Sequence, residues 1–192
     1  MANAQWNVDA SHSNLQFAVR HMVITKVRGA FRSFRGSLAL DEGDELGLRE
    51  VDVSIDAASI DTGEPKRDEH LRGTDFLDVA AFPTLRFQSR SIARQGDRYR
   101  ITGDLSIHGV TRSVVLDAEF QGRGKDPWGG QRAAFSARTS IDREDFGLTW
   151  NQVLEAGGVL VGTKIEIDIE LQAIRAAQPE RAPAREAAQP SA

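Results

Sequence analysis

Apolar and polar residues alternate along most of this sequence, and that alternation limits the fold more than any other feature. In the stretch 164–171, three isoleucines and a leucine occupy the odd positions and charged residues occupy the even ones, while Val159 and Val161 extend the apolar side. Successive side chains of a β-strand point to opposite faces, so this pattern is typical of a strand with one apolar face. The other stretches of this kind are 14–20, 51–56, 84–88, 99–107, 114–120 and 133–141, and a further stretch around 31–34 is out of phase.

Turn signals separate these stretches, which predicts about eight strands in an all-β fold. The pattern is typical of an antiparallel barrel or sandwich. Between Phe31 and Phe34 the alternation slips by one position, and this slip predicts a β-bulge near Arg32 and Ser33.

The register of one hairpin follows from charge alone. If His108–Gly109 is a two-residue turn, the numbers of facing residues sum to 217. Arg100 then faces Asp117 and Arg98 faces Glu119 on the outer side, while the apolar residues of both strands point inward. Opposite charges at both exposed pairs favour this register.

One short helix is expected. Residues 66–72 contain neither glycine nor proline, follow Thr-Gly-Glu-Pro and precede Gly73, and residues 74–78 can add a further turn. The whole connection, residues 62–83, is expected to cap one end of the barrel.

The chain divides into a body, residues 1–174, and a tail, residues 175–192. Ala, Pro, Arg, Glu and Gln dominate after Arg175, and no large apolar residue occurs there. Such a segment buries too little surface to offset its ordering entropy, which predicts a disordered tail. A docking peptide is the alternative.

Composition and charge exclude several classes of protein. The net charge of −4 gives no polyelectrolyte attraction to nucleic acid, and the absence of cysteine excludes disulfides and thiolate chemistry. No apolar run approaches the roughly 20 residues of a membrane helix. The start of the chain lacks the pattern of a secretory signal, so a cytoplasmic location is expected.

The four histidines do not have the spacing of metal ligands, so neither a metal nor another cofactor is expected. His108 is interpreted as a turn residue. His12 follows Asp9 and Ser11, the residue types of a catalytic relay, but neighbours on an extended strand point to opposite faces. Local capping of the first strand is therefore the expected role of this group, and no catalytic residue is assigned.

The inward faces supply an apolar lining. An eight-stranded barrel has an interior that side chains can just fill, or that can hold one small ligand. Periodicity alone favours a filled interior. The aromatic residues that would project toward it are Phe17, Phe31, Phe34, Phe87, Phe135 and Trp150.

Six motifs in this order resemble one family, over about residues 6–172. They are Trp-Asn-Val-Asp-Ala-Ser-His-Ser at 6–13, Phe-Ala-Val-Arg-His at 17–21, Gly-Ala-Phe-Arg-Ser-Phe-Arg-Gly at 29–36, the region 67–83, Gly-Asp-Leu-Ser-Ile-His-Gly-Val-Thr at 103–111, and Ile-Asp-Arg-Glu-Asp-Phe-Gly at 141–147. The sequence resembles the YceI-like family of lipid- or polyisoprenoid-binding proteins.

This resemblance implies an eight-stranded antiparallel lipocalin-like barrel with a short helical cap. It implies a binding protein without catalytic activity, often a homodimer, that encloses an isoprenoid or other long-chain lipid. Many members are exported to the periplasm, whereas the start of this chain predicts the cytoplasm. The expected ligand-binding residues are Phe17, Val19, His21, Phe31, Phe34, Val53, Arg67, His70, Leu85, Phe87, Ile101, Leu105, Phe135 and Trp150.

Within this set, the matched motifs make His21, Arg67 and His70, together with Asp68, candidates to contact the ligand's head group. The competing interpretation is that these side chains only fix the cap. Two other functions remain open. One is an isomerase or hydrolase that uses His12 or His21 in the barrel pocket, and the other is a filled barrel that acts as an interaction module.

Overall fold

The computed structural model describes residues 3–22, 24–41, 47–155 and 157–177. The strands in this part of the chain are β1 (Asn3–Val8), β2 (Asn14–His21), β3 (Thr25–Phe31), β4 (Phe34–Asp41), β5 (Leu48–Asp56), β6 (Ile60–Asp61), β7 (Thr84–Gln95), β8 (Arg98–Ile107), β9 (Val110–Lys125), β10 (Gln131–Asp142) and β11 (Val161–Arg175). The helices are α1 (Pro65–Arg72) and the 3₁₀ turns η1 (Ala10–His12), η2 (Ala57–Ser59) and η3 (Glu144–Phe146).

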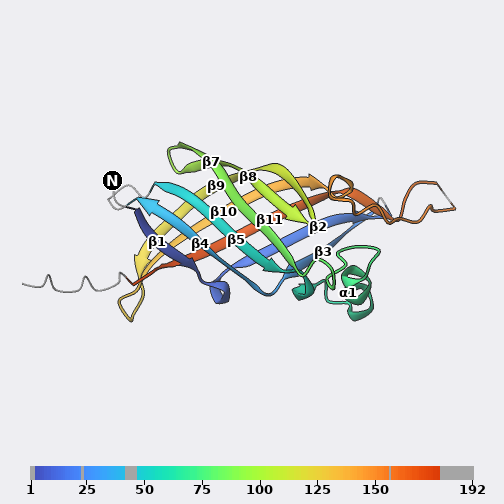
Figure 1. Ribbon diagram of the computed structural model, residues 1–192, viewed down its shortest axis with the longest axis horizontal. Helices are drawn as coiled ribbons and strands as arrows, with labels where there is room; N and C mark the ends of the chain where they lie inside the picture. The colour runs from blue at the N-terminus through green and yellow to red at the C-terminus, as the bar shows by residue number, and fades with distance from the viewer. Residues whose placement is uncertain (1–2, 23, 42–46, 156, 178–192) are drawn as a thin grey trace, which may run out of the picture.

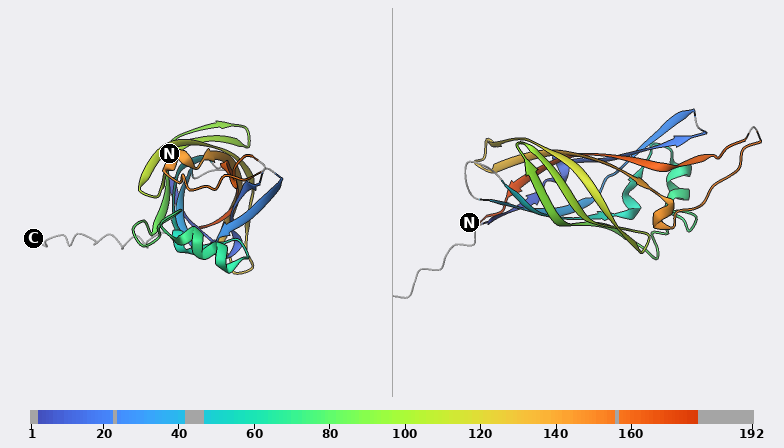
Figure 2. Two further views of the ribbon diagram at one scale, coloured as in Figure 1. Left: turned by 90° about the vertical axis from the view of Figure 1, so that its right-hand side faces the viewer. Right: turned by 90° about the horizontal axis from the view of Figure 1, so that it is seen from above.

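These strands form one closed antiparallel barrel (Figures 1 and 2). Three of the barrel strands are interrupted, so that β1 and β2, β3 and β4, and β5 and β6 are each two halves of one strand. The ring closes where β11 pairs with β1 through residues 173–175 and with β2 through residues 161–170. The expected all-β barrel of eight strands is confirmed.

The slip between Phe31 and Phe34 is a strand interruption, so the expected bulge is wrong. β3 ends at Phe31 and β4 begins at Phe34, and the backbones of Arg32 and Ser33 bond instead to residues around η2. The neighbouring strands are interrupted at the same level by η1 and η2. One wall of the barrel therefore breaks across three adjacent strands, which a single sequence slip does not reveal.

The expected register of the β8–β9 hairpin is confirmed. Arg100 pairs with Asp117 and Arg98 with Glu119. The φ angles of His108 and Gly109 are 51° and 73°, the left-handed conformation that a type I′ turn requires at both central positions.

The strand expected from Val159 onward begins two residues later. Val159 forms only an isolated bridge to Val153, and β11 starts at Val161. At its other end β11 includes Arg175, which pairs with Trp6. Residues 178–192 of the expected tail lie outside the described residues, so the tail stays a prediction.

The two ends of the barrel differ. Trp6, Leu40 and Tyr99 lie in the core at the end that holds the start of β1, and they are 3%, 0% and 2% exposed. At the opposite end lies the expected cap, which contains α1 (Figure 2). Glu64 caps α1 through the backbone N–H of Lys66. We call the end that holds the start of β1 the closed end, and the end that holds α1 the mouth.

Glycines in the barrel wall make room for aromatic rings. A Cβ on Gly103 would lie 2.5 Å from the Phe87 ring and 2.5 Å from the carbonyl oxygen of Gln88. A Cβ on Gly29 would lie 2.4 Å from the Phe17 ring. Because these rings rest against the bare backbone of a neighbouring strand, they take up less of the barrel interior.

Gly103→Ala is expected to destabilise the protein by about 1–3 kcal/mol, because the new methyl group overlaps the Gln88 backbone, which cannot rotate away. The matched control is Gly124→Ala in β9, where a Cβ would meet open space. Thermal unfolding of both variants measures the difference. Equal melting temperatures would contradict the close packing at Gly103.

Candidate functional site

The barrel encloses an elongated cavity of about 600 Å³. Inward-facing side chains of the strands, together with the cap and the segment that precedes β11, form its walls. The lining is apolar along the strands, and most of its polar side chains lie at the mouth. The interior is therefore hollow, and the filled interior that periodicity favours is wrong.

All but one of the expected ligand-binding residues line this cavity. The lining members are Phe17, Val19, His21, Phe31, Val53, Arg67, His70, Leu85, Phe87, Ile101, Leu105, Phe135 and Trp150. Phe34 is the exception, because it follows the strand interruption and is buried in the core, 8% exposed, without reaching the cavity surface. That these residues bind a ligand stays a prediction.

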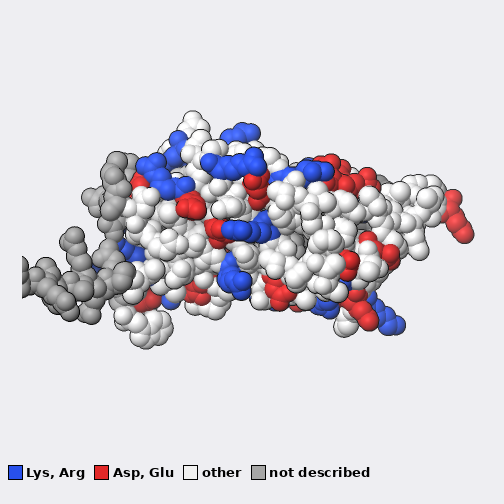
Figure 3. All heavy atoms as spheres, in the orientation of Figure 1, with Lys and Arg blue, Asp and Glu red and all other residues white. Residues whose placement is uncertain are grey.

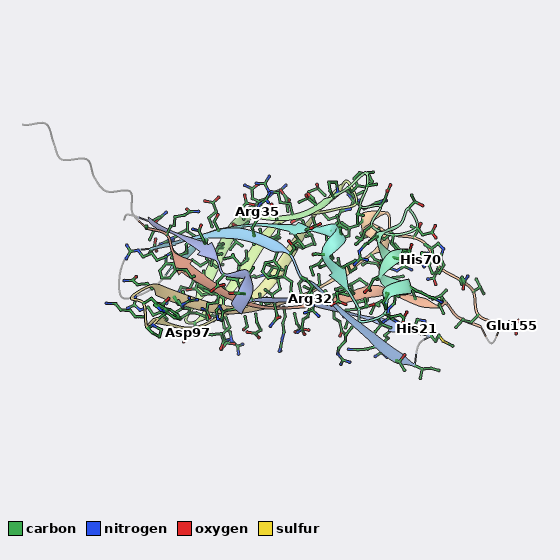
Figure 4. The ribbon with its side chains drawn as sticks, turned by 90° about the horizontal axis from the view of Figure 1, so that it is seen from below. His21, Arg32, Arg35, His70, Asp97 and Glu155 are labelled. Atoms are coloured by element: carbon green, nitrogen blue, oxygen red, sulfur yellow. The ribbon has the colours of Figure 1, made fainter. Side chains whose placement is uncertain are left out.

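Polar side chains form a collar at the mouth. Thr62, Glu64, Lys66, Arg67 and His70 come from the cap. His21 comes from the end of β2, where it pairs with Val161, and Figure 4 places it at the same end of the barrel as His70. Among the described residues, His21 makes no side-chain hydrogen bond or ion pair.

Two of the head-group candidates hold the cap together. The Asp68 carboxylate is buried and accepts hydrogen bonds from the backbone N–H and the hydroxyl of Thr62. Arg67 Nε donates to the same hydroxyl at 2.7 Å. These bonds match the competing interpretation, in which Arg67 and Asp68 fix the start of α1.

His70 joins the cap to the opposite rim. Its Nε2 lies 2.8 Å from Asp75 Oδ2. Its ring packs edge-on against Phe76 and Trp150, with centroids 5.0 and 4.7 Å apart. Trp150 belongs to the segment between η3 and β11, so this aromatic cluster spans the mouth.

Arg143 lines the cavity although the sequence did not single it out. It is 3% exposed, and its guanidinium donates to the carbonyl oxygens of Gly162 and Leu148. Burial lowers the pKa of this guanidinium. The bonds attach the segment after η3 to β11, so Arg143 shapes the wall beside Trp150. The spacing of Arg143 within its motif carries no signal of this burial.

Asp9, Ser11 and His12 do come together, because η1 bends the chain. Ser11 Oγ donates to Asp9 Oδ1 at 2.6 Å, and His12 Nδ1 lies 2.8 Å from Asp9 Oδ2. The hydroxyl of Ser11 lies 3.0 Å from the same Nδ1. A relay needs the acid and the hydroxyl on opposite nitrogens of the ring. None of the three residues lines the cavity.

This group instead fastens the interruption between β1 and β2. Arg132 of β10 donates to Asp9 Oδ2 at 2.6 Å, and Asp9 N donates to the carbonyl oxygen of Gln172 in β11. The hydrogen bond from Ser11, with further bonds from Arg132 and His12, holds the pKa of Asp9 well below its usual range. The expected capping role fits this geometry.

In the described part of the chain, no three histidine or carboxylate side chains gather as metal ligands. Nor does the structure contain, among the residues it describes, a helix long and apolar enough to cross a membrane. On the face of the barrel shown in Figure 3, basic and acidic side chains (blue and red) are interspersed.

A closed antiparallel barrel with a capped mouth and an apolar interior cavity defines the lipocalin-like class of proteins. The chain belongs to the YceI-like family, whose domain model matches residues 6–173.

Relatives of known sequence agree with this assignment. A UPF0312 protein of Photorhabdus laumondii is 39% identical over 145 residues, which cover 76% of this chain and 75% of that protein. Protein YceI of Salmonella newport is 39% identical over 148 residues, covering 76% and 77% of the two chains.

Solved structures share the fold. BcnA of Burkholderia cenocepacia superposes with a TM-score of 0.73 at 23% identity, covering 86% of this chain and 98% of that one. The YCEI protein of Campylobacter jejuni gives 0.70 at 28% identity, covering 82% and 90%. A polyisoprenoid-binding domain of Saccharophagus degradans gives 0.68 at 16% identity, covering 91% and 100%.

Asp9→Asn is expected to destabilise the protein by about 1–2 kcal/mol at neutral pH, because the amide loses the charge-assisted bonds to Arg132 and His12. Folding lowers the pKa of Asp9, so this stabilisation is fully present above the unfolded pKa of about 4 and is lost as the pH falls toward the folded value. Urea unfolding over a pH series measures it.

The control is Asp168→Asn. Asp168 pairs with Arg138 on the surface, where the two side chains are 56% and 81% exposed, so the change should stay within about 0.5 kcal/mol. The curves of wild type and Asp9→Asn should approach each other in acid. A difference that is constant with pH would contradict the role of the Asp9 charge.

Proposed function

We propose that this protein binds a long-chain amphiphile, a polyisoprenoid or fatty-acid-like lipid, and carries or sequesters it in the barrel without catalysing a reaction. One observation carries the proposal: the cavity is apolar along its length and has its polar collar at the mouth. An amphiphile has the same distribution of polarity, with its chain inside and its head group at the collar.

The volume and the polarity of the cavity set the class of ligand. A methylene group takes up about as much space as a water molecule, roughly 30 Å³, so the cavity holds on the order of twenty chain carbons. Each buried methylene contributes about 0.8 kcal/mol. A chain of that length offsets an association cost of about 4–15 kcal/mol, so tight binding needs no special polar chemistry.

Family membership supports this proposal. The name of the Saccharophagus neighbour records polyisoprenoid binding for that protein, and its fold is the one found here. The cytoplasmic location and the homodimer expected from the sequence stay predictions.

The contacts of the histidines favour binding over catalysis. His12 lies outside the cavity, and His21 lines it without a side-chain acid or hydroxyl partner among the described residues. His70 lines the cavity beside Asp75, but its ring is held between Phe76 and Trp150. We interpret His70 as a structural residue that holds the cap against the segment containing Trp150.

Native mass spectrometry of the purified protein, followed by organic extraction, tests the proposal directly. A stoichiometric long-chain lipid is the expected result. A ligand-free mass, with no thermal shift on addition of prenyl phosphates, quinones or fatty acids, would overturn it.

Ala137→Trp is expected to abolish lipid retention while the barrel still folds. Ala137 lines the cavity on β10, so an indole there occupies space that the chain would take. The matched control is Ala134→Trp on the same strand, whose side chain does not line the cavity. Extraction after native mass spectrometry measures bound lipid, and circular dichroism checks the fold. Unchanged retention by folded Ala137→Trp would show that the chain lies elsewhere.

Trp150→Ala is expected to speed ligand release by about two- to tenfold, because it removes the aromatic contact with His70 that spans the mouth. Stopped-flow displacement of the fluorescent fatty acid cis-parinaric acid measures the rate. Trp128→Ala, at the β9–β10 turn near the closed end, serves as the control. An equal release rate in both variants would place the exit elsewhere.

A further inference from the structure

Exposed apolar side chains gather at the mouth. Among the described residues, five large hydrophobic side chains are exposed, and four of them lie on the two segments that border the mouth. Ile24 and Val153 are 80% and 85% exposed, and Met22 and Val159 are 43% and 39% exposed. The fifth, Trp128, lies near the opposite end of the barrel. Four exposed side chains in one region are unusual, whereas one alone is not.

The two segments project beyond the barrel. One consists of Met22 and Ile24 between β2 and β3, and the other of residues 148–155 and 157–160 before β11. Figure 2 shows both regions extending past the cap, and Figure 4 places Glu155 at the outermost point. Met22 N donates to the carbonyl oxygen of Leu160 at 2.8 Å, and His21 pairs with Val161. These contacts hold the two segments, which we call the mouth tips, as one unit.

The mouth tips continue the cavity wall. His21 lines the cavity and is followed by the exposed Met22. Leu160 and Val161 line the cavity and are preceded by the exposed Val159. At both tips, an exposed apolar residue therefore stands next in the chain to a residue of the cavity lining.

The strand ends behind the mouth tips carry positive charge, whereas the one charged residue in the sequence of the tips is Glu155. Residues 18–28 and 161–166 contain the basic residues Arg20, Lys26, Arg28 and Lys164, with Glu166 as the one acidic residue. Lys26 donates to the Glu166 carboxylate, and Lys26, Lys164 and Arg20 together hold the pKa of that carboxyl below its usual range. This flank is basic although the whole chain is acidic.

Size and shape decide between a protein partner and a lipid surface. A stable protein interface buries about 800 Å² on each partner, which the ends of two narrow loops do not supply. A bilayer accepts isolated apolar side chains at the level of its head groups, and anionic lipid adds about 1 kcal/mol for each nearby basic residue. The exposed apolar side chains of the mouth tips and the basic residues beside them therefore fit a lipid surface.

We propose that the mouth tips dock the barrel on an anionic bilayer, with the apolar side chains among the lipid head groups and the basic flank against the lipid phosphates. Docking in this orientation places the cavity opening at the membrane, so an amphiphile passes between bilayer and barrel without crossing water. The transfer of ligand rests on the proposed function, whereas the docking does not.

A substitution of Glu155 provides a control that should change vesicle binding in the opposite direction. This exposed carboxylate at the outermost point of the mouth tips meets the negative charge of the bilayer first. Glu155→Gln is therefore expected to strengthen binding to anionic vesicles by about fivefold. A structural disturbance of the tips would weaken binding instead.

The experiment is flotation of the ligand-free protein with vesicles of phosphatidylcholine alone and of phosphatidylcholine mixed with phosphatidylglycerol. Binding to the mixed vesicles is expected, with at least tenfold loss in the double variant Ile24→Ser, Val153→Ser. Arg20→Gln with Arg28→Gln should reduce binding to the mixed vesicles and flatten its salt dependence. Trp128→Ser, which removes an exposed apolar side chain far from the mouth, should bind like wild type.

Three outcomes would overturn the docking. The first is equal flotation of the double variant and wild type, and the second is loss of flotation in Trp128→Ser. The third is a double variant that converts a dimer to a monomer in native mass spectrometry while vesicle binding is unchanged, which would assign the mouth tips to self-association. Ala137→Trp separates this proposal from lipid carriage, because it should dock normally and retain no lipid.

Discussion

The barrel depends on the hydrogen bonds that its last strand makes with both halves of its first strand. β11 pairs with β1 near the closed end and with β2 toward the mouth, so one strand closes the ring over almost its whole length. At the interruption between β1 and β2, the backbone of Gln172 bonds to Asp9 N and to Ser13 Oγ. The group around Asp9 thus completes a seam that would otherwise open, and the cavity exists because this seam is closed.

A closed ring of eight strands leaves an interior that ordinary side chains can fill. Here the interior stays open, in part because Gly29 and Gly103 let the rings of Phe17 and Phe87 rest against the wall. The polar side chains lie at the mouth, where Asp68 fixes the cap and Arg143 attaches the segment after η3 to β11. Small residues in the barrel wall thus leave the interior hollow, and buried hydrogen bonds at the rim hold the mouth in place.

The eight-stranded barrel and the hairpin register were predictable, and all but one of the expected ligand-binding residues do line the cavity. Alternation and paired charges such as Arg98 and Glu119 are local signals. The interruption at Arg32 and Ser33 was not predictable, since a one-position slip looks the same whether a strand bulges or breaks. Arg143 was missed because its partners are backbone carbonyls on another strand and loop, which leave no trace in residue type. The hollow interior depends on how rings rotate, and periodicity does not encode this.

The described ends of the chain both lie at the closed end of the barrel (Figure 1). β1 begins there, and Ala176 N donates to the carbonyl oxygen of Gln5 at 2.8 Å, one residue after β11 ends. A linker or a solid support joined at residue 3 or residue 177 therefore holds the molecule by the closed end. Copies immobilised in this way would all have the same orientation, with the mouth of each barrel facing the surrounding solution.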